Sequence, residues 1–290
     1  MFKKIEECPI CDNISFINLI VAQDHLVSQD SFAISECTKC KFKVTSPRPI
    51  DEELYKYYQS ENYISHTGKG NNLINSIYKI VRNYTIAKKY KLIKERVKNR
   101  SILDFGCGTG DLLTYFQNKG WSINGIEPDD QARKIAANKT KIEIHSRLLQ
   151  DKAKYTAITL WHVLEHVPDL NQTIDSLKNK LEKKGRIFVA VPNCESFDAN
   201  HYGQYWAGYD LPRHLYHFTP DTMKKLMKKH NLKVKEILPM YFDSFYVSML
   251  SEKYRTKKDN YLSALKIGYQ SNKIASKNNQ YSSLIYVIKK

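Results

Sequence analysis

Apolar and polar residues alternate with two different periodicities along the chain. Between residues 72 and 98, apolar side chains recur every three or four positions with Lys and Arg between them, which predicts one or two amphipathic helices. From residue 101 onward, short apolar runs alternate with helix-length segments, a pattern that predicts a parallel sheet with helices on both faces. The apolar positions of the helical part are Leu73, Ile77, Ile80, Val81, Tyr84, Ala87, Leu92 and Ile93.

Proline, glycine and helix-capping residues mark the boundaries of these elements. Pro128 and Asp129 suit the first turn of a helix, while Gly120 and Gly185 mark helix ends. The predicted strands are 101–105, 122–127, 141–145, 155–161, 186–192 and 232–238, and 282–290 is a candidate for a last one. The predicted helices between them are 111–119, 128–138, 170–183 and 220–230.

The first 60 residues have a different character. Two segments, 15–22 and 31–37, predict the strands of a hairpin, and Pro47 and Pro49 then break the chain. Asp51 can cap a short helix that runs to Tyr58. We therefore expect a small module over 1–60, a helical cap or linker over 61–99, and an α/β domain over 100–290.

Four cysteines form two C-x-x-C pairs that flank the predicted hairpin. Cys8 and Cys11 precede it, and Cys37 and Cys40 close it. Two such turns can present four thiolates tetrahedrally, which predicts a structural zinc site in a ribbon-like module. A redox motif is the alternative, but its duplication argues against it. Cys107 and Cys194 stand alone and are interpreted as small buried residues.

The charge balance narrows the class of partner. The 290 residues are 42% apolar and carry a formal net charge of +16, which favours anionic partners such as nucleic acid, lipid headgroups or phosphorylated substrates. The alternative is a lysine-rich surface without a dedicated partner. No apolar run is long enough to cross a membrane, and the lysines near the start are not followed by a secretory h-region, so we expect the cytoplasm.

Three glycines at the end of the first predicted strand indicate a close ligand. Gly106, Gly108 and Gly110 lie where that strand turns into a helix, and ligands of open parallel sheets bind at this edge. Glu127 ends the second strand, where a carboxylate can accept hydrogen bonds from ribose hydroxyls. The G-x-G-x-G spacing differs from a dinucleotide motif, and Asp104 would repel a pyrophosphate while suiting an amino group.

Four motifs in this order carry a resemblance to a known family. "LDFGCGTG", "GIEPD", "LWHVLEHVPD" and "GRIFVAVPN" resemble class I S-adenosylmethionine-dependent methyltransferases, most of all the branch of ubiquinone-type and bacterial sugar methyltransferases. The resemblance covers about residues 100–240. It implies a doubly wound, Rossmann-like, mostly parallel sheet of seven strands, with 282–290 as an antiparallel strand beside the sixth. Residues 193–218 and 240–280 would then be insertions on the substrate side.

The resemblance also implies roles for individual residues. Asp104 and the glycines would flank the methionine end and the ribose, Glu127 would bind the ribose hydroxyls, and Pro128 would lie against adenine. Trp161 and His162 would line the pocket near the methionine moiety. The expected cofactor-binding set is Asp104, Gly106, Gly108, Gly110, Glu127, Pro128, Trp161 and His162. N-terminal cysteine-rich modules similar to this one occur in sugar C-methyltransferases, which favours a glycan-type acceptor.

Histidines are the candidate catalytic residues. A hydroxyl acceptor needs a base, and His214 and His217 in the loop after the fifth strand are the candidates, with His162 third. The alternative is that they hold the loop by hydrogen bonds. His162, Glu165 and His166 match H-x-x-E-H, but Pro168 and the strand context argue against a zinc peptidase. Glu165 and His166 could bind a divalent metal, or instead cap a helix and pack under the loop.

These observations predict a methyltransferase that acts on a small or carrier-linked acceptor, such as a sugar or glycan, a phenol or a lipid-linked molecule. An RNA methyltransferase is the second hypothesis, which the charge, the cysteine module and the tyrosines favour. A non-enzymatic zinc module that binds nucleic acid or a membrane surface is the third, supported by nine Lys and Arg against two acids in residues 251–290.

Overall fold

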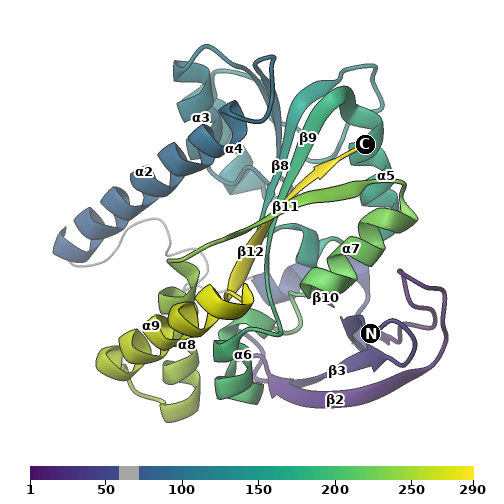
Figure 1. The fold of residues 1–290 in the computed structure, drawn as a ribbon, viewed down its shortest axis with the longest axis vertical. Helices are drawn as coiled ribbons and strands as arrows, with labels where there is room; N and C mark the ends of the chain where they lie inside the picture. Colours follow the sequence, from purple (N-terminus) through teal and green to yellow (C-terminus); the bar gives the residue numbers. More distant parts are fainter. Residues whose placement is uncertain (59–71) are drawn as a thin grey trace.

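The computed structural model of the protein describes residues 1–58 and 72–290 (Figure 1). For residues 72–80 it describes the helix but not the side chains, so the predicted apolar positions Leu73, Ile77 and Ile80 lie outside the described side chains. The helix predicted over 72–98 is α2, Asn72–Lys94. The short helix predicted after Asp51 is the 3-10 helix η1, Asp51–Tyr58.

A sheet of six strands forms the centre of the described structure, in the order β11-β12-β9-β8-β6-β7. Strands β7, β6, β8 and β9 are parallel, whereas β12 is antiparallel to both β9 and β11. This confirms the Rossmann-like fold and the place expected for the last strand. The bounds are β6 Ser101–Phe105, β7 Ser122–Ile126, β8 Tyr155–Trp161, β9 Leu181–Pro192, β11 Lys233–Pro239 and β12 Ser283–Lys289.

The third predicted strand, 141–145, is reduced to a single bridge between Ile126 and His145. Helix α4, Asp130–Thr140, extends past its predicted end and stops at Lys141, which adopts a left-handed conformation with φ 58°. Few residues are then left to pair with β7. The described sheet therefore has six strands where seven were expected.

Strand β9 begins earlier than predicted, at Leu181 instead of residue 186. Helix α5 ends at Lys180, and Gly185 lies inside the strand. A Cβ atom on Gly185 would lie 2.9 Å from the carbonyl oxygen of Thr156, so this glycine allows two backbones to approach closely. Gly185, which was predicted to end a helix, is therefore a strand residue at a position where only glycine fits the packing.

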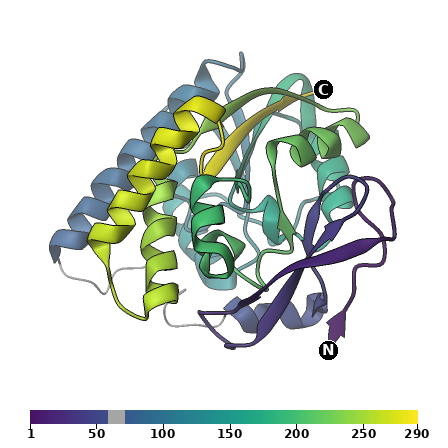
Figure 2. The ribbon, with the colours of Figure 1, turned by 60° about the horizontal axis from the view of Figure 1, so that its bottom comes forward.

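Helices cover both faces of the sheet (Figures 1 and 2). Along β6, Ile102 and Leu103 point to opposite sides and enter two separate apolar clusters. The cluster around Ile102 is covered by α2, α3 (Asp111–Asn118) and α4, and the cluster around Leu103 by α5 (Leu170–Lys180) and α7 (Pro220–Lys229).

The predicted N-terminal hairpin is present, but its sheet is completed by a distant part of the chain. Strands β2 (Phe16–Gln23), β3 (Ser31–Cys37) and β4 (Lys43–Thr45) are joined by β10 (Tyr216–His217), which pairs antiparallel with β4. Strands β1 (Phe2–Lys3) and β5 (Arg48–Pro49), which flank this segment of the sequence, form a separate antiparallel sheet of two strands. The segment that contains the candidate bases is therefore built into the sheet of the cysteine module.

The two expected insertions contain helices. Residues 193–218 include α6 (Phe197–Tyr202) and two short 3-10 turns, η4 (Gly203–Tyr205) and η5 (Ala207–Tyr209). Residues 240–280 form a helical hairpin of α8 (Asp243–Thr256) and α9 (Tyr261–Asn278), which pack side by side at one end of the molecule (Figure 2).

Candidate active site

The glycine bend after β6 leaves an open space above its backbone. Gly106 and Gly108 have φ values of 80° and 53°, in the region that favours glycine. A Cβ atom on Gly106 would lie 2.4 Å from Val163, whereas a Cβ on Gly108 would meet nothing within 4 Å. Gly106 is therefore required by packing, and Gly108 faces the space that a ligand can occupy.

Glu127 ties this bend to the end of β7. One carboxylate oxygen accepts a hydrogen bond from the backbone N–H of Gly108 at 2.7 Å, and the other accepts from Asp129 N–H at 2.9 Å. Burial raises the pKa of Glu127, although these two backbone bonds oppose the shift. Each oxygen keeps a further lone pair, so the carboxylate can still accept hydrogen bonds from a diol.

Asp104, the last residue but one of β6, lies inside the site with only 3% of its surface exposed. The hydroxyl of Thr159 on β8 donates to it at 2.6 Å, and burial raises the pKa of Asp104 to about 7. Lys89 of α2 lies close enough to Asp104 to oppose that shift by its charge. The Lys89 ammonium stands 4.1 Å from the centre of the Trp161 ring.

Sequence reasoning missed Lys89, because it is one of many lysines on an amphipathic helix and no spacing distinguishes it. Trp161, which was expected here, ends β8, and its indole N–H is buried with no hydrogen-bond partner among the described residues. An unpaired donor, a buried carboxylate and an open backbone fit a ligand that carries an amino acid moiety and a ribose. The residues present therefore fit S-adenosylmethionine.

His162 follows β8 in a left-handed conformation, with φ 56°. Its Nε2 lies 3.0 Å from Oδ2 of Asp243 at the start of α8, and its Nδ1 lies 3.4 Å from Oε1 of Glu165. Burial opposes a charge on the ring, but the bonds to Asp243 and Glu165 outweigh it and raise the pKa of His162 to about 10. His162 is therefore held as an imidazolium between two carboxylates. Asp243 was not predicted, since it comes from an insertion without a motif.

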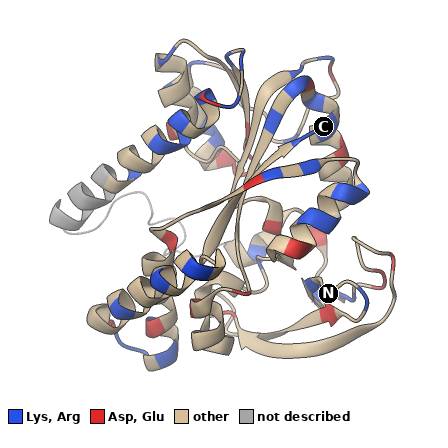
Figure 3. Ribbon diagram, viewed as in Figure 1, with Lys and Arg blue, Asp and Glu red and all other residues tan. Residues whose placement is uncertain are grey.

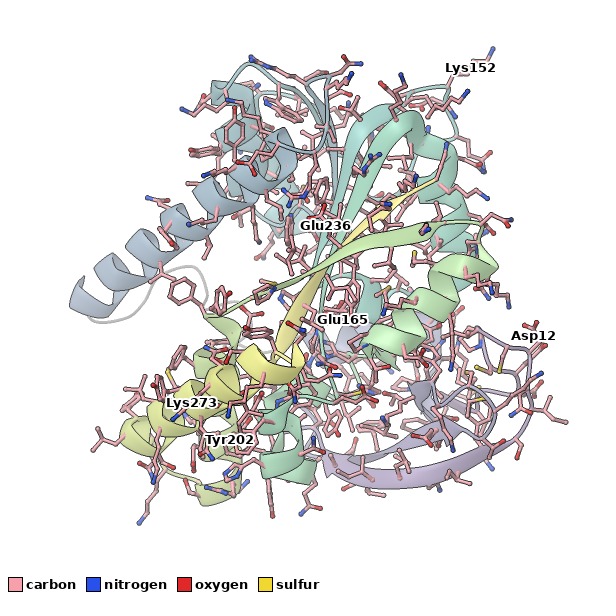
Figure 4. All side chains as sticks on the ribbon, viewed as in Figure 1. Asp12, Lys152, Glu165, Tyr202, Glu236 and Lys273 are labelled. Atoms are coloured by element: carbon pink, nitrogen blue, oxygen red, sulfur yellow. The ribbon has the colours of Figure 1, made fainter. Side chains whose placement is uncertain are left out.

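Glu165 lies in the interior of the molecule, near its centre in Figure 4, and is fully buried. Neither of its oxygens makes a hydrogen bond of ordinary geometry with a described residue. It does not cap a helix, because the cap of α5 is Asp169, whose side chain accepts from Gln172 N–H. The charges of His162 and its neighbours lower the pKa of Glu165 against the effect of burial.

His166 and His214 lie beside this carboxylate, and Nδ1 of each ring contacts a backbone carbonyl. The Nδ1–H of His214 donates to the carbonyl of Gly208 at 2.9 Å, and Nδ1 of His166 lies 3.1 Å from the carbonyl of Arg213. His214 Nε2 lies 4.0 Å from Oε1 of Glu165 and 3.9 Å from Oδ2 of Asp210. One ligand atom from each of Glu165, His166 and His214 lies within 4.8 Å of the others, so this set could hold a divalent cation.

His217 lies in a different setting, on β10. Its Nε2–H donates to Oγ1 of Thr45 at 3.0 Å, and Thr45 in turn donates to the carbonyl of His214 at 2.6 Å. Burial lowers the pKa of His217 well below its usual value. The structure therefore brings His162 and His214 to one carboxylate, and places His217 in the link to the cysteine module.

The four predicted zinc ligands come together. Sγ of Cys8 lies 3.5 Å from Sγ of Cys40, the Cys11–Cys37 pair has the same distance, and all four sulfurs lie within 4.8 Å. Sulfurs that bind zinc tetrahedrally at about 2.3 Å stand about 3.8 Å apart, so the cluster has the size of a zinc site. Backbone N–H groups of Cys40 and Lys39 outweigh burial and lower the pKa of Cys37 to about 6.

Comparison with known proteins agrees with this geometry. A family model described as a methyltransferase domain matches residues 78–237. The ubiquinone biosynthesis O-methyltransferase of Pelagibacter ubique is 28% identical over 178 residues, which cover 57% of this chain and 72% of that protein. The protein of the same name from Nitrosospira multiformis is 24% identical over 164 residues, 51% of this chain and 69% of its own.

Among solved structures, the magnesium protoporphyrin IX methyltransferase of Synechocystis, with bound S-adenosylhomocysteine, is similar with a TM-score of 0.53. It is 12% identical, and the match covers 83% of this chain and all of that one. This likeness supports the fold, and the family model, which spans more than half of the chain, supports the membership. The chain belongs to the methyltransferase domain family, within the class I methyltransferases that use S-adenosylmethionine as methyl donor.

Proposed function

We propose that the protein methylates a hydroxyl of a small or carrier-linked acceptor, such as a sugar or glycan, a phenol or a lipid-linked molecule. The observation that carries this proposal is the pair formed by Glu165 and His214, a buried carboxylate 4.0 Å from Nε2 of a histidine whose Nδ1 is hydrogen-bonded to the carbonyl of Gly208. Relatives named as ubiquinone O-methyltransferases support an oxygen acceptor.

The donor is held by the residues of the bend and its surroundings. Glu127 would accept from the ribose hydroxyls, Pro128 would lie against adenine, and Asp104 with Trp161 would hold the methionine end. The set is the predicted one, Asp104, Gly106, Gly108, Gly110, Glu127, Pro128, Trp161 and His162, and we add Lys89 to it. When bound, S-adenosylmethionine supplies an activated methyl group on a sulfonium.

The acceptor's proton is taken by His214. Its Nδ1–H is fixed on the carbonyl of Gly208, so Nε2 is the basic atom. The hydroxyl would give its proton to this nitrogen while its oxygen takes the methyl group that the bound donor would supply, and the electron pair of the carbon–sulfur bond would stay on the donor's sulfur. Of the other candidates, His162 is already cationic and orients the site, while His217 holds the loop through Thr45.

We further propose that Cys8, Cys11, Cys37 and Cys40 bind one structural zinc ion. The size of the sulfur cluster supports this, and so do the four cysteines being free thiols. We keep 1–60, 61–99 and 100–290 as the proposed division of the chain into module, cap or linker, and methyltransferase domain.

The acceptor class can be identified by tritiated methyl transfer from S-adenosylmethionine into a fractionated lysate of the source cell. The proposal expects label in the glycan, lipid or small-molecule fraction. Label confined to RNA would overturn it and favour the RNA methyltransferase hypothesis.

Two variants separate donor binding from proton transfer. Glu127→Ala should weaken S-adenosylmethionine binding by about 1–3 kcal/mol in calorimetry, because it removes charged hydrogen bonds. His214→Ala should leave that affinity unchanged and lower turnover by about 100-fold or more. Glu143→Ala, at an exposed position, is the matched control for the first change. Full turnover in His214→Ala would remove this residue as the base.

A further inference from the structure

We propose that the outer face of the α8–α9 hairpin docks on an anionic lipid surface. This deepens the proposed function, because it names the surface from which a lipid-linked acceptor would be taken. It rests on that function in this respect only, since the docking itself needs no methyl transfer.

Large apolar side chains are unusually exposed on this hairpin. Eight exposed apolar or tyrosine side chains fall between residues 241 and 269, among them Leu262 at 84%, Tyr269 at 63% and Leu265 at 49% exposure. Leu262, Leu265 and Tyr269 are spaced by three and four positions, so they form one stripe along α9. A contiguous stripe of this kind marks an interaction surface, unlike scattered single residues.

The buried side of the hairpin, toward its partner helix and toward residues 197–209, carries mainly small side chains. The buried positions of α8 include Ser244, Ser248 and Ser251, and those of α9 include Ala264, Gly268, Ser271 and Ala275. A Cβ atom on Gly268 would lie 2.7 Å from the Phe245 ring and 3.0 Å from its Cα, so the two helices approach closely there. Helices that contact lipid have this arrangement, with small residues where they pack against other helices and large residues on the outside.

The charge beside the stripe selects an anionic partner. A hollow on α9 is lined by Lys266, Tyr269, Gln270, Lys273, Ile274 and Lys277. Helix α9 contains no acidic residue, and Asp259 is the only acid after residue 253, against eight Lys and Arg. Figure 3 shows Lys and Arg along α9, and Figure 4 places Lys273 on this helix. Exposed leucines between the lysines favour lipid over RNA, which binds aromatic and basic groups.

The hairpin would lie in the plane of the membrane surface. No described helix has the length and apolarity needed to cross a bilayer, whereas an amphipathic basic helix suits its interface. Helix α8 begins at Asp243, which contacts His162 in the candidate site. Docking of this hairpin would therefore bring the headgroup of a lipid-linked acceptor close to the entrance of the site.

The test is sedimentation of the full-length protein with lipid vesicles. We expect binding at least about tenfold tighter to vesicles with about a third phosphatidylglycerol than to pure phosphatidylcholine, and weaker binding as salt increases. Leu262→Asp with Leu265→Asp should weaken binding by about tenfold or more. Lys266→Gln, Lys273→Gln and Lys277→Gln should cost about fivefold per lysine.

The matched control is Ile17→Asp with Leu19→Asp on β2. The exposed fractions of these two side chains are similar to that of Leu265. Equal loss in the control, salt-independent binding to neutral vesicles, or binding of single-stranded RNA without vesicle binding would overturn the proposal. Self-association that depends on Leu262, without vesicle binding, would also overturn it. Binding of S-adenosylmethionine, measured by calorimetry, shows whether each variant is folded. Absence of donor binding with intact vesicle binding would count against the proposed function alone.

Discussion

The proposed donor end and the proposed acceptor side of the candidate site are held together in opposite ways. The donor end is local: Asp104, Gly108 and Glu127 lie within 24 positions of one another, at the ends of two neighbouring parallel strands. The acceptor side is assembled from distant segments, as β4 pairs with β10 and Thr45 bonds to the carbonyl of His214. Local chain geometry therefore builds the donor end, whereas long-range contacts build the acceptor side.

Arg213 makes a further long-range link of this kind. It is almost fully buried, lies 3.0 Å from Asp24 of the cysteine module, and also contacts Asp210 at 2.8 Å. Burial opposes the charge of Asp24, but Arg213 outweighs it and lowers the pKa of that carboxyl. A buried pair of this kind gives little net stability, yet breaking it leaves an unpaired charge. The module and the loop of His214 are thus committed to one arrangement.

Removal of zinc should have the largest effect, and it should fall on the acceptor side. Chelation should release one zinc ion per chain and unfold the cysteine module, because structural zinc contributes about 10–16 kcal/mol in small zinc-binding peptides. Loss of β4 should free β10 and abolish methyl transfer, while donor affinity changes less than about threefold. Metal analysis, hydrogen exchange of residues 1–58 and calorimetry measure the three quantities.

Cys107→Ser is the matched control, since Cys107 is a buried cysteine outside the cluster. It should keep its zinc and its exchange pattern. A chain that is folded and free of metal would contradict the zinc proposal, and an equal loss of donor binding on chelation would show that the two sides are not separable.

The same division explains what the sequence could predict. Strands β6, β7 and β8, the bend and the place of Glu127 follow from patterns within a few tens of residues, and the structure agrees closely. Lys89 and Asp243 could not be predicted, because tertiary packing alone brings α2 and α8 to Trp161 and His162. The pairing of β10 with β4 joins segments more than 170 residues apart, and two-residue strands carry no pattern.

Neutralising one aspartate on each side should change stability in opposite directions. Burial raises the pKa of Asp104 from the ordinary 3.8 to about 7 in the folded protein. The folded state then holds the proton more tightly, so its stability falls as pH rises from about 4 to about 7 and stays lower above that. Asp104→Asn should be more stable than the wild type by about 4 kcal/mol above about pH 7, and nearly equal at about pH 4.

Asp24→Asn is the counterpart on the acceptor side. The pKa of Asp24 is lowered, so its contribution to stability is present above the ordinary value and is lost as pH falls. The substitution should cost about 3–5 kcal/mol at neutral pH, because Arg213 keeps a buried and partly unpaired charge. Denaturant unfolding across pH measures both variants. A loss of stability in Asp104→Asn at neutral pH would contradict the assignment of Asp104 as a destabilising, functional carboxyl.

The smallest expected effect is the loss of stability on replacing a glycine by alanine, at one position on each side of the site. Gly108 and Gly203 both have φ 53°, and a Cβ atom on either would meet nothing within 4 Å. Alanine should therefore cost about 1–2 kcal/mol of stability at Gly108 from backbone strain alone, and at least as much at Gly203, where ψ is −126°. Only Gly108→Ala should also weaken S-adenosylmethionine binding, because its new methyl group enters the space above the bend. Equal donor affinity in the two variants would mean that this space is not the donor site, however well the surrounding carboxylates fit it.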